Sequence, residues 1–132
     1  MKDLLVPVHK DGQSLLEALV AMAIAILIIG GLVAAVIVAV RNAQFARNQV
    51  LATKYANEGM EKIRSYRDQN DWDNFKSECG SYSLGAVPTP FTRTHACQEE
   101  VADKMKVTIT VSWTDSIGTH KSELNSYFTK WK

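Results

Sequence analysis

Residues 18–40 form an uninterrupted apolar run, and no other feature of the sequence limits the possible folds as strongly. The run holds 23 residues without a charge, an amide or a hydroxyl, and it is rich in Ala, Ile, Leu and Val. As a helix it would be roughly 35 Å long, enough to cross a bilayer core of about 30 Å. The polar remainder of the chain is too small to bury such a helix on every side. We therefore predict a single membrane span.

The competing interpretation of this run is a cleavable secretory signal. A short polar segment precedes the run, and Ala43 offers a small residue for a cleavage site beyond it. The apolar core of such signals has about 7 to 15 residues, which is shorter than this run. An anchor that stays in the chain therefore accounts better for its length.

Composition separates the chain into an apolar part and a polar part without naming a partner. Lys and Arg together number 15 and Asp and Glu 14, so the net charge of +1 supplies no general attraction to nucleic acid or anionic lipid. A length of 132 residues leaves room for one small domain after the apolar run.

A single carboxylate stands at the start of the apolar segment. A charged side chain such as that of Glu17 costs about 2.5 to 3.5 kcal/mol at the bilayer centre on insertion scales, and less near the headgroups. Placement of Glu17 among the headgroups is one interpretation. Gly12, which ends a short polar leader just before the apolar segment, favours a processing signal instead.

Together, Gly12, Gln13 and Glu17 resemble the processing signal of the type IV prepilins. In that family, a membrane-embedded aspartyl prepilin peptidase cuts after the Gly and methylates the new amino terminus. The resemblance implies a leader of residues 1–12, cleavage between Gly12 and Gln13, and Glu17 as the fifth residue of the mature chain. The family usually has Phe or Met at the first mature position, where this chain has Gln13.

The resemblance makes residues 13–40 the transmembrane and assembly helix. Family members often have Pro at the position of Ala34, and Gly30 and Gly31 occupy the neighbouring turn of this chain. Each glycine lowers helix stability by about 1 kcal/mol relative to Ala. We therefore expect Gly30 and Gly31 either to loosen the helix locally inside a filament or simply to adapt its packing.

Helical periodicity continues beyond the apolar run through residues 41–67. Small and apolar side chains recur at steps of three and four residues, whereas most charged side chains lie on other faces. The resulting stripe consists of Ala52, Ala56, Gly59, Ile63 and Tyr66. Small residues allow a close approach, so we expect this stripe to pack on a sheet from the same chain.

Residues 75–132 are expected to complete the head with a loop and an antiparallel sheet. Residues 105–113 alternate apolar and polar side chains and predict a strand with one buried face. A turn follows at 115–119, and residues 121–131 can return as the hairpin partner, with Leu124 and Phe128 on one face. Residues 91–99 form a third candidate strand. The predicted fold class is α+β, with a long N-terminal helix packed on a small antiparallel sheet of three or four strands, as in pilins.

Cys79 and Cys97 are the only cysteines of the chain. A disulfide between them would close a loop of about 18 residues, contribute roughly 3 kcal/mol, and fit an oxidising compartment. Two free thiols, or a metal site that includes His95, are the alternatives. No four-ligand spacing for a metal exists in the sequence.

Basic residues near the span give conflicting information on its orientation. Lys2 and Lys10 precede the span while Arg41, Arg47 and Lys54 follow it, so a count of positive charges slightly favours a cytoplasmic head. The processing signal and the cysteine pair favour the opposite orientation, with the N-terminus inside and the head, residues 41–132, outside. We give these two features more weight.

Few residues of the head suggest catalysis or nucleic-acid binding. Ser112, Asp115 and His120 fall in one hairpin, but no nucleophile elbow accompanies them. Lysines near the last hairpin would be able to contact DNA phosphates, or would instead form a solvated face or a protected edge. These lysines are Lys104, Lys106, Lys121, Lys130 and Lys132. We expect no enzymatic activity, no cofactor and no metal site.

The sequence favours a structural subunit of a type IV pilus or of a type II secretion-like filament, as a minor pilin or pseudopilin rather than a major subunit. The expected partners are other pilin subunits, the prepilin peptidase and an inner-membrane assembly platform, with DNA as a further candidate. The expected location is the cytoplasmic membrane, then an extracellular filament or a periplasmic pseudopilus. The alternative is a signal-anchored surface binding protein that does not polymerise.

Overall fold

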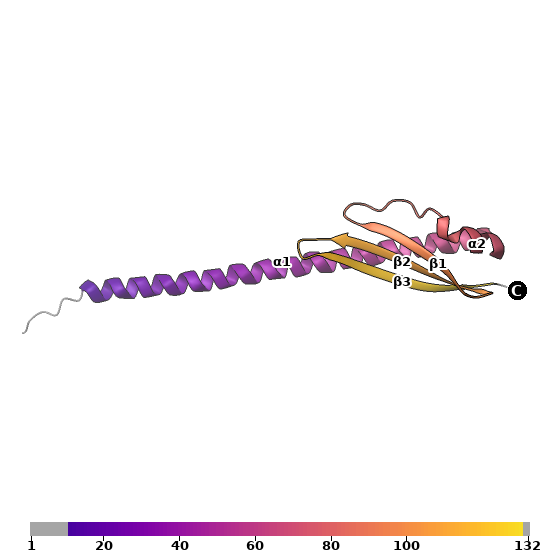
Figure 1. Cartoon of the computed structure of the whole chain (residues 1–132). Coiled ribbons are helices and arrows are strands. Elements are labelled where there is room, and N and C mark those ends of the chain that lie inside the picture. Colours follow the sequence, from indigo (N-terminus) through magenta and orange to yellow (C-terminus); the bar gives the residue numbers. More distant parts are fainter. Residues whose placement is uncertain (1–10, 131–132) are drawn as a thin grey trace, which may run out of the picture. The chain divides into compact units, whose positions relative to one another are not determined.

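The computed structural model describes the backbone of residues 11–130 (Figure 1) and the side chains of residues 14–130. Residues 1–10, 131 and 132 lie outside the described residues. The elements are α1 (Asp11–Gln69), α2 (Trp72–Glu78), a 3-10 turn (Cys79–Ser81), β1 (Thr92–Val101), β2 (Lys104–Thr114) and β3 (Thr119–Thr129). The chain divides into two compact units, Met1–Ala43 and Gln44–Lys132. The predicted α+β class is confirmed.

The described part of the first unit is the apolar portion of α1. Its residues are mainly Ala, Leu, Ile, Val and Met, and no proline interrupts the chain between Pro7 and Pro88. Proline within a helix removes a backbone hydrogen bond and clashes with the preceding turn. The backbone is helical through Gly30 and Gly31, so the two glycines do not break the helix.

The second unit is built on an antiparallel sheet, in which the described residues contribute three strands in the order β1-β2-β3. β2 is central and alternates buried and partly exposed side chains, as the period of two predicts. In its middle, Ile109 lies opposite His95 of β1 and Leu124 of β3. Leu124 and Phe128 pack against the core from β3, which confirms their predicted shared face.

The portion of α1 in the second unit packs along the inner face of β2. The ring of Phe45 lies 6.1 Å from that of Trp113, at the end of β2. At the opposite end of the described sheet, Arg67 Nη2 donates to the carbonyl oxygen of Thr129 at 3.3 Å. Thr129 is paired with Lys104 at the start of β2. The helix therefore runs antiparallel to β2 (Figure 1).

The predicted stripe of α1 is the face that meets the sheet. Ala52, Ala56 and Ile63 are at most 1% exposed, Gly59 is buried, and Tyr66 is partly buried. A methyl group added to Gly59 would lie 3.2 Å from Arg93 Cδ and 3.3 Å from Ile109 Cγ2. Gly59 therefore permits a close approach between the helix and the sheet.

Enlarging Gly59 should destabilise the head. We expect Gly59→Leu to lower the free energy of unfolding by about 1 to 3 kcal/mol, because a larger side chain overpacks a filled site. Gly59→Ala should be near neutral, since a gain of about 1 kcal/mol in helix propensity offsets its crowding. Denaturant unfolding of the full chain in detergent, followed by tryptophan fluorescence, measures both. The control Gly80→Leu adds a side chain where nothing lies within 4 Å of an added Cβ; an equal loss there would contradict the packing argument.

The short helix α2 is an element that the sequence analysis does not predict, since it expects a loop from residue 75. Asp71 caps it, because its Oδ1 accepts from the backbone N–H of Asn74 at 2.9 Å. Trp72 and Phe75 face the core from α2, and the guanidinium of Arg67 lies 5.4 Å from the centre of the Trp72 ring. Seven residues are too few for a helical period to stand out in a sequence window.

The segment between the 3-10 turn and β1 is held by two cations. Its Leu84 is buried, and the carbonyl oxygen of Leu84 accepts from Lys62 Nζ at 2.6 Å and from Arg93 Nη2 at 2.5 Å. Arg93 Nη1 also donates to the carbonyl oxygen of Tyr55 at 3.0 Å. These bonds tie the segment to α1 and β1 and close the head beside the disulfide described below.

Candidate functional site

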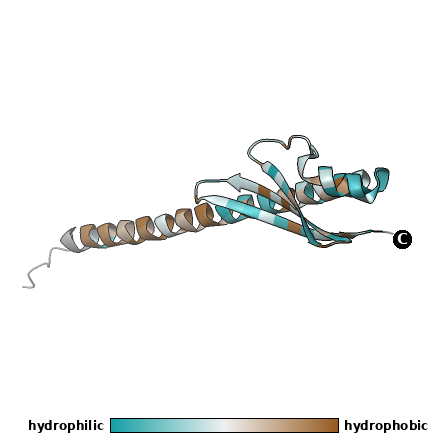
Figure 2. Cartoon of the chain, turned by 45° about the vertical axis from the view of Figure 1, so that its right-hand side comes forward, coloured by the Kyte–Doolittle hydropathy of each residue, from teal (hydrophilic) through white to brown (hydrophobic). Residues whose placement is uncertain are grey.

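The apolar portion of α1 leaves its side chains uncovered. Every side chain from residue 14 to residue 40 is exposed, and Figure 2 shows this stretch as almost uniformly hydrophobic. Within the described residues, α1 is the one helix long and apolar enough to cross a membrane. An exposed apolar surface of this size is unfavourable in water. Residues 18–40 are therefore a candidate single membrane span.

Glu17 is the only charged side chain between residues 14 and 40. It borders a shallow open hollow on the helix surface together with Leu16, Val20, Ala21 and Ile24. The ion pairs found among the described residues all lie in the second unit. Glu17 thus places one carboxylate on the otherwise apolar, exposed surface of this segment.

The other predicted residues of this segment are Gly12, Gln13, Gly30 and Gly31. The backbone of Gly12 and Gln13 belongs to the first turn of α1, whereas their side-chain surroundings and residues 1–10 of the predicted leader lie outside the described residues. A Cβ added to Gly30 or Gly31 would meet nothing within 4 Å. Processing at Gly12 and loosening at the paired glycines stay predictions.

Cys79 and Cys97 form a disulfide across a sequence separation of 18 residues. The bond joins the 3-10 turn to β1, and Cys79 is fully buried. His95, the residue weighed as a metal ligand, has Nε2 at 2.9 Å from the carbonyl oxygen of Cys79. The described residues hold no cluster of three potential metal ligands. The cysteines therefore staple the head rather than bind a metal with His95.

Removing this disulfide should cost the head roughly 3 kcal/mol, the chain-entropy estimate for a closed loop of this length. We expect the double variant Cys79→Ala, Cys97→Ala to unfold at lower denaturant concentration than the wild type. Dithiothreitol should destabilise the wild type by a similar amount and leave the double variant unchanged. Equal sensitivity of both proteins to the reductant would contradict the assignment.

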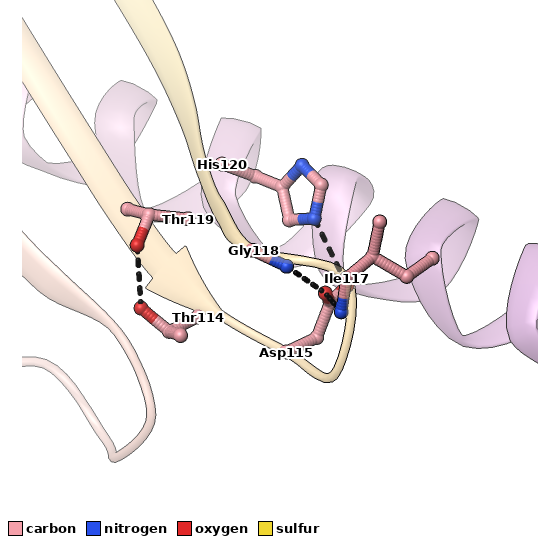
Figure 3. A network of polar contacts seen from close by, with 6 residues as sticks. All are labelled: Thr114, Asp115, Ile117, Gly118, Thr119 and His120. Atoms are coloured by element: carbon pink, nitrogen blue, oxygen red, sulfur yellow. Dashed lines mark hydrogen bonds and ion pairs between the residues drawn. The ribbon is translucent and has the colours of Figure 1, made fainter.

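The turn between β2 and β3 contains a polar network centred on Asp115 (Figure 3). Asp115 Oδ1 accepts from the backbone N–H groups of Ile117 at 2.8 Å and Gly118 at 3.1 Å. Its Oδ2 lies 3.0 Å from His120 Nε2. Gly118 has a φ of +153°, a backbone angle that residues with a side chain rarely adopt. The hydrogen bonds of Asp115 and the backbone conformation of Gly118 therefore hold this turn in place.

Ser112 is not part of this network, so the structure joins only two members of the weighed catalytic triad. Trp113 is paired with His120 across β2 and β3, and Trp113 faces the core. Successive side chains of a strand point to opposite faces, so Ser112 faces away from His120. No Ser-His-Asp relay is formed at this hairpin.

The pKa of Asp115 is lowered, chiefly by the hydrogen bond from the Ile117 backbone N–H and further by His120 and the Gly118 N–H, while partial desolvation opposes the shift. A lowered folded pKa means that Asp115 stabilises the head above its unfolded pKa of about 4 and loses this contribution as the pH falls through the folded value.

We therefore expect Asp115→Asn to weaken the acid dependence of stability. Between pH 7 and pH 3, the melting temperature of the wild-type head should fall further than that of the variant. Asp103→Asn, which alters an exposed carboxylate in the turn between β1 and β2, should keep the wild-type acid dependence. Parallel curves for wild type and Asp115→Asn would show that the network does not stabilise the turn.

Two of the lysines predicted as possible DNA contacts have acidic or aromatic neighbours. Lys104 Nζ lies 3.3 Å from a Glu100 carboxylate oxygen and 4.1 Å from the centre of the Tyr127 ring. Lys121 pairs with Glu123 at 2.9 Å. Acidic and aromatic neighbours thus occupy two of the five, while Lys132 lies outside the described residues. DNA binding stays an untested prediction.

Comparisons with protein-family models, curated proteins and solved structures give no match.

Proposed function

We propose that this chain is a subunit of an extracytoplasmic helical filament of the type IV pilin class, as a minor pilin or pseudopilin. One observation carries the proposal: the apolar part of α1 is exposed along its length and bears a single carboxylate, Glu17, near its start. An isolated anchor would be more stable in lipid without that charge. A bundle of such helices would supply it with a partner.

The partner we propose is the amino terminus of a neighbouring subunit. Cleavage after Gly12 would create an ammonium group on Gln13, which is charged at neutral pH. Glu17 of an incoming subunit would then pair with the Gln13 ammonium of its neighbour. The exposed apolar surface would lie in the bilayer before assembly and against other subunits afterwards, so one helix would serve as anchor and as filament core.

The head supports this proposal through its compartment and size. Disulfides persist mainly in oxidising compartments, so the bond between Cys79 and Cys97 favours a head outside the cytoplasm. The head is small, with one sheet beside one helix segment, which favours a minor subunit over a major one, since major subunits of this family usually carry larger heads. Its proposed partners are other subunits, the prepilin peptidase and the membrane assembly platform.

The mature amino terminus tests the proposal. Mass spectrometry of the protein from the membrane and from sheared filaments should find Gln13 as the first residue in both fractions. Intact Met1 in filaments would overturn the pilin assignment. An uncut protein that never sediments as a polymer would instead support a signal-anchored surface protein, and cleavage beyond Ala43 would support a secretory signal.

A further inference from the structure

The end of the head that carries the turn between β2 and β3 exposes two apolar side chains. Ile117 in this turn is 68% exposed, and Phe45 on α1 is 40% exposed. The ring of Phe45 lies 5.0 Å from that of His120, which ties α1 to the turn network. We call Phe45 and residues 115–118 the β2–β3 tip.

The carboxylate of Asp115 is already paired within this turn. The two Asp115 carboxylate oxygens face the backbone N–H groups of Ile117 and Gly118 and the ring of His120 (Figure 3). The side chains of Asp115 and His120 are only about a quarter exposed. The carboxylate is thereby turned into the hairpin, and Ile117 is left as the large side chain at its apex. Such a tip loses little hydration of charge when it enters a less polar medium.

Chain connectivity keeps this tip close to the span. Phe45 follows Val40, the last residue of the apolar run, by five residues, which can reach at most about 18 Å. This limit holds for any arrangement of the two units. The headgroup layer adds about 5 to 7 Å on each side of the hydrocarbon core. Phe45 and the turn that packs beside it therefore lie within reach of that layer.

The other end of the sheet provides an internal contrast. Val101 at the end of β1 is 62% exposed, nearly as much as Ile117. It lies beside the start of β2, since Val101 is paired with Lys104, and that end contacts Arg67 through Thr129. Along α1 this is 22 residues beyond Phe45, or about 33 Å at the helical rise. The two ends of the sheet are thus similarly exposed but lie beside positions of α1 that are far apart.

Basic residues flank the tip in the sequence. Arg41 and Arg47 stand on either side of Phe45, and both are exposed. Anionic lipid headgroups attract basic residues next to a span. The occupant that fits both the apolar apex and these charges is the phospholipid surface that the span enters.

We propose that the β2–β3 turn docks the head on the membrane: in the inserted monomer, Ile117 and Phe45 enter the headgroup layer while Arg41 and Arg47 contact lipid phosphates. The docked turn sets the orientation of the head before assembly and is released when the subunit leaves the bilayer. This inference rests on the proposed insertion of residues 18–40 and does not require filament assembly.

Nitroxide labelling of the full chain in vesicles tests this docking. Ile117→Cys, Val101→Cys and Leu27→Cys each add one reactive thiol, because Cys79 and Cys97 are joined in a disulfide and no reductant is used. The protein is reconstituted at low density in phosphatidylcholine containing a minority of phosphatidylglycerol. Collision rates with oxygen, which concentrates in lipid, and with a nickel chelate, which stays in water, report the depth of each label.

We expect the label at 117 to collide with nickel roughly threefold less often than the label at 101, because an apolar group docked at the interface lies about 5 to 10 Å into the boundary between headgroups and acyl chains. Equal nickel access at 117 and 101, with Leu27→Cys protected, would overturn the docking while leaving the span intact. Nickel access at 27 would instead remove the insertion on which the proposed function rests. Protection at 117 that appears only at high protein density would assign the tip to a neighbouring subunit and overturn the proposal.

Discussion

The Glu17→Ala variant should insert in the membrane at least as well as the wild type and be cleaved after Gly12, yet enter filaments poorly. Removing the carboxylate lowers the cost of placing the helix in lipid. In the proposed filament, however, the same change would leave the Gln13 ammonium of the neighbouring subunit buried without a partner, at a cost of about 3 to 5 kcal/mol. At 1.4 kcal/mol per factor of ten, incorporation should fall by about two to three and a half orders of magnitude.

Three further variants separate charge from size and from general damage. Glu17→Gln keeps the shape without the charge and should fail like Glu17→Ala, whereas Glu17→Asp, one methylene shorter, should be intermediate. Glu58→Ala is the control, because it removes an exposed carboxylate that pairs with Lys54 on the same helix, and such pairs contribute little. It should enter filaments normally.

The measurement compares each variant in membrane fractions and in sheared filaments. Incorporation of Glu17→Ala at the wild-type level would show that Glu17 is only an interfacial residue. A subunit at the extreme tip of a filament has no neighbour ahead of it, so its position must be established by labelling of the wild type. Wild-type labels along the filament shaft together with normal incorporation of Glu17→Ala would contradict the pairing.

Replacing Gly12 by leucine should leave the precursor uncut. The resemblance to type IV prepilins places the scissile bond between Gly12 and Gln13, and a bulky residue there would obstruct the peptidase. Because the uncut chain has no ammonium at Gln13, it should also be absent from filaments although it inserts in the membrane. Immunoblotting and mass spectrometry of membrane fractions measure the loss of residues 1–12.

The control for this variant is Gly80→Leu, an equally large replacement at a site where an added Cβ meets nothing within 4 Å. It should be processed like the wild type. Normal cleavage of Gly12→Leu would contradict the predicted processing signal. Normal assembly of an uncut Gly12→Leu chain would contradict the proposed pairing with Glu17. The two results are separable, because cleavage and sedimentation are scored independently.

The sequence alone was sufficient to predict the main features of the fold. The apolar run of residues 18–40, the stripe through Ala52, Ala56 and Gly59, and the alternation along β2 are all present in the structure. Each of these depends on the periodicity of a continuous segment, which can be read without knowing the rest of the chain. The disulfide was also accessible, because the chain has only two cysteines.

Short elements and buried polar residues could not be predicted in this way. Helix α2 was not predicted, because its two core residues, Trp72 and Phe75, are too few to show a period. Arg67 is buried although it is charged. Its position depends on Trp72 and on the Thr129 carbonyl, which lies 62 residues away in the sequence. The sequence around Arg67 does not predict that partner.

The sequence by itself determined the candidate span, the amphipathic continuation of the helix and the central strand, because hydrophobic periodicity is a local property. Only the tertiary structure decided which polar residues meet. The register of β2 on β3 sets His120 opposite Trp113 and beside Asp115 while Ser112 faces the other side of the sheet. The physical reason is the period of two in a strand, because a shift of one residue in register would exchange the two faces of the strand. The number of residues between two positions in the sequence does not reveal this register.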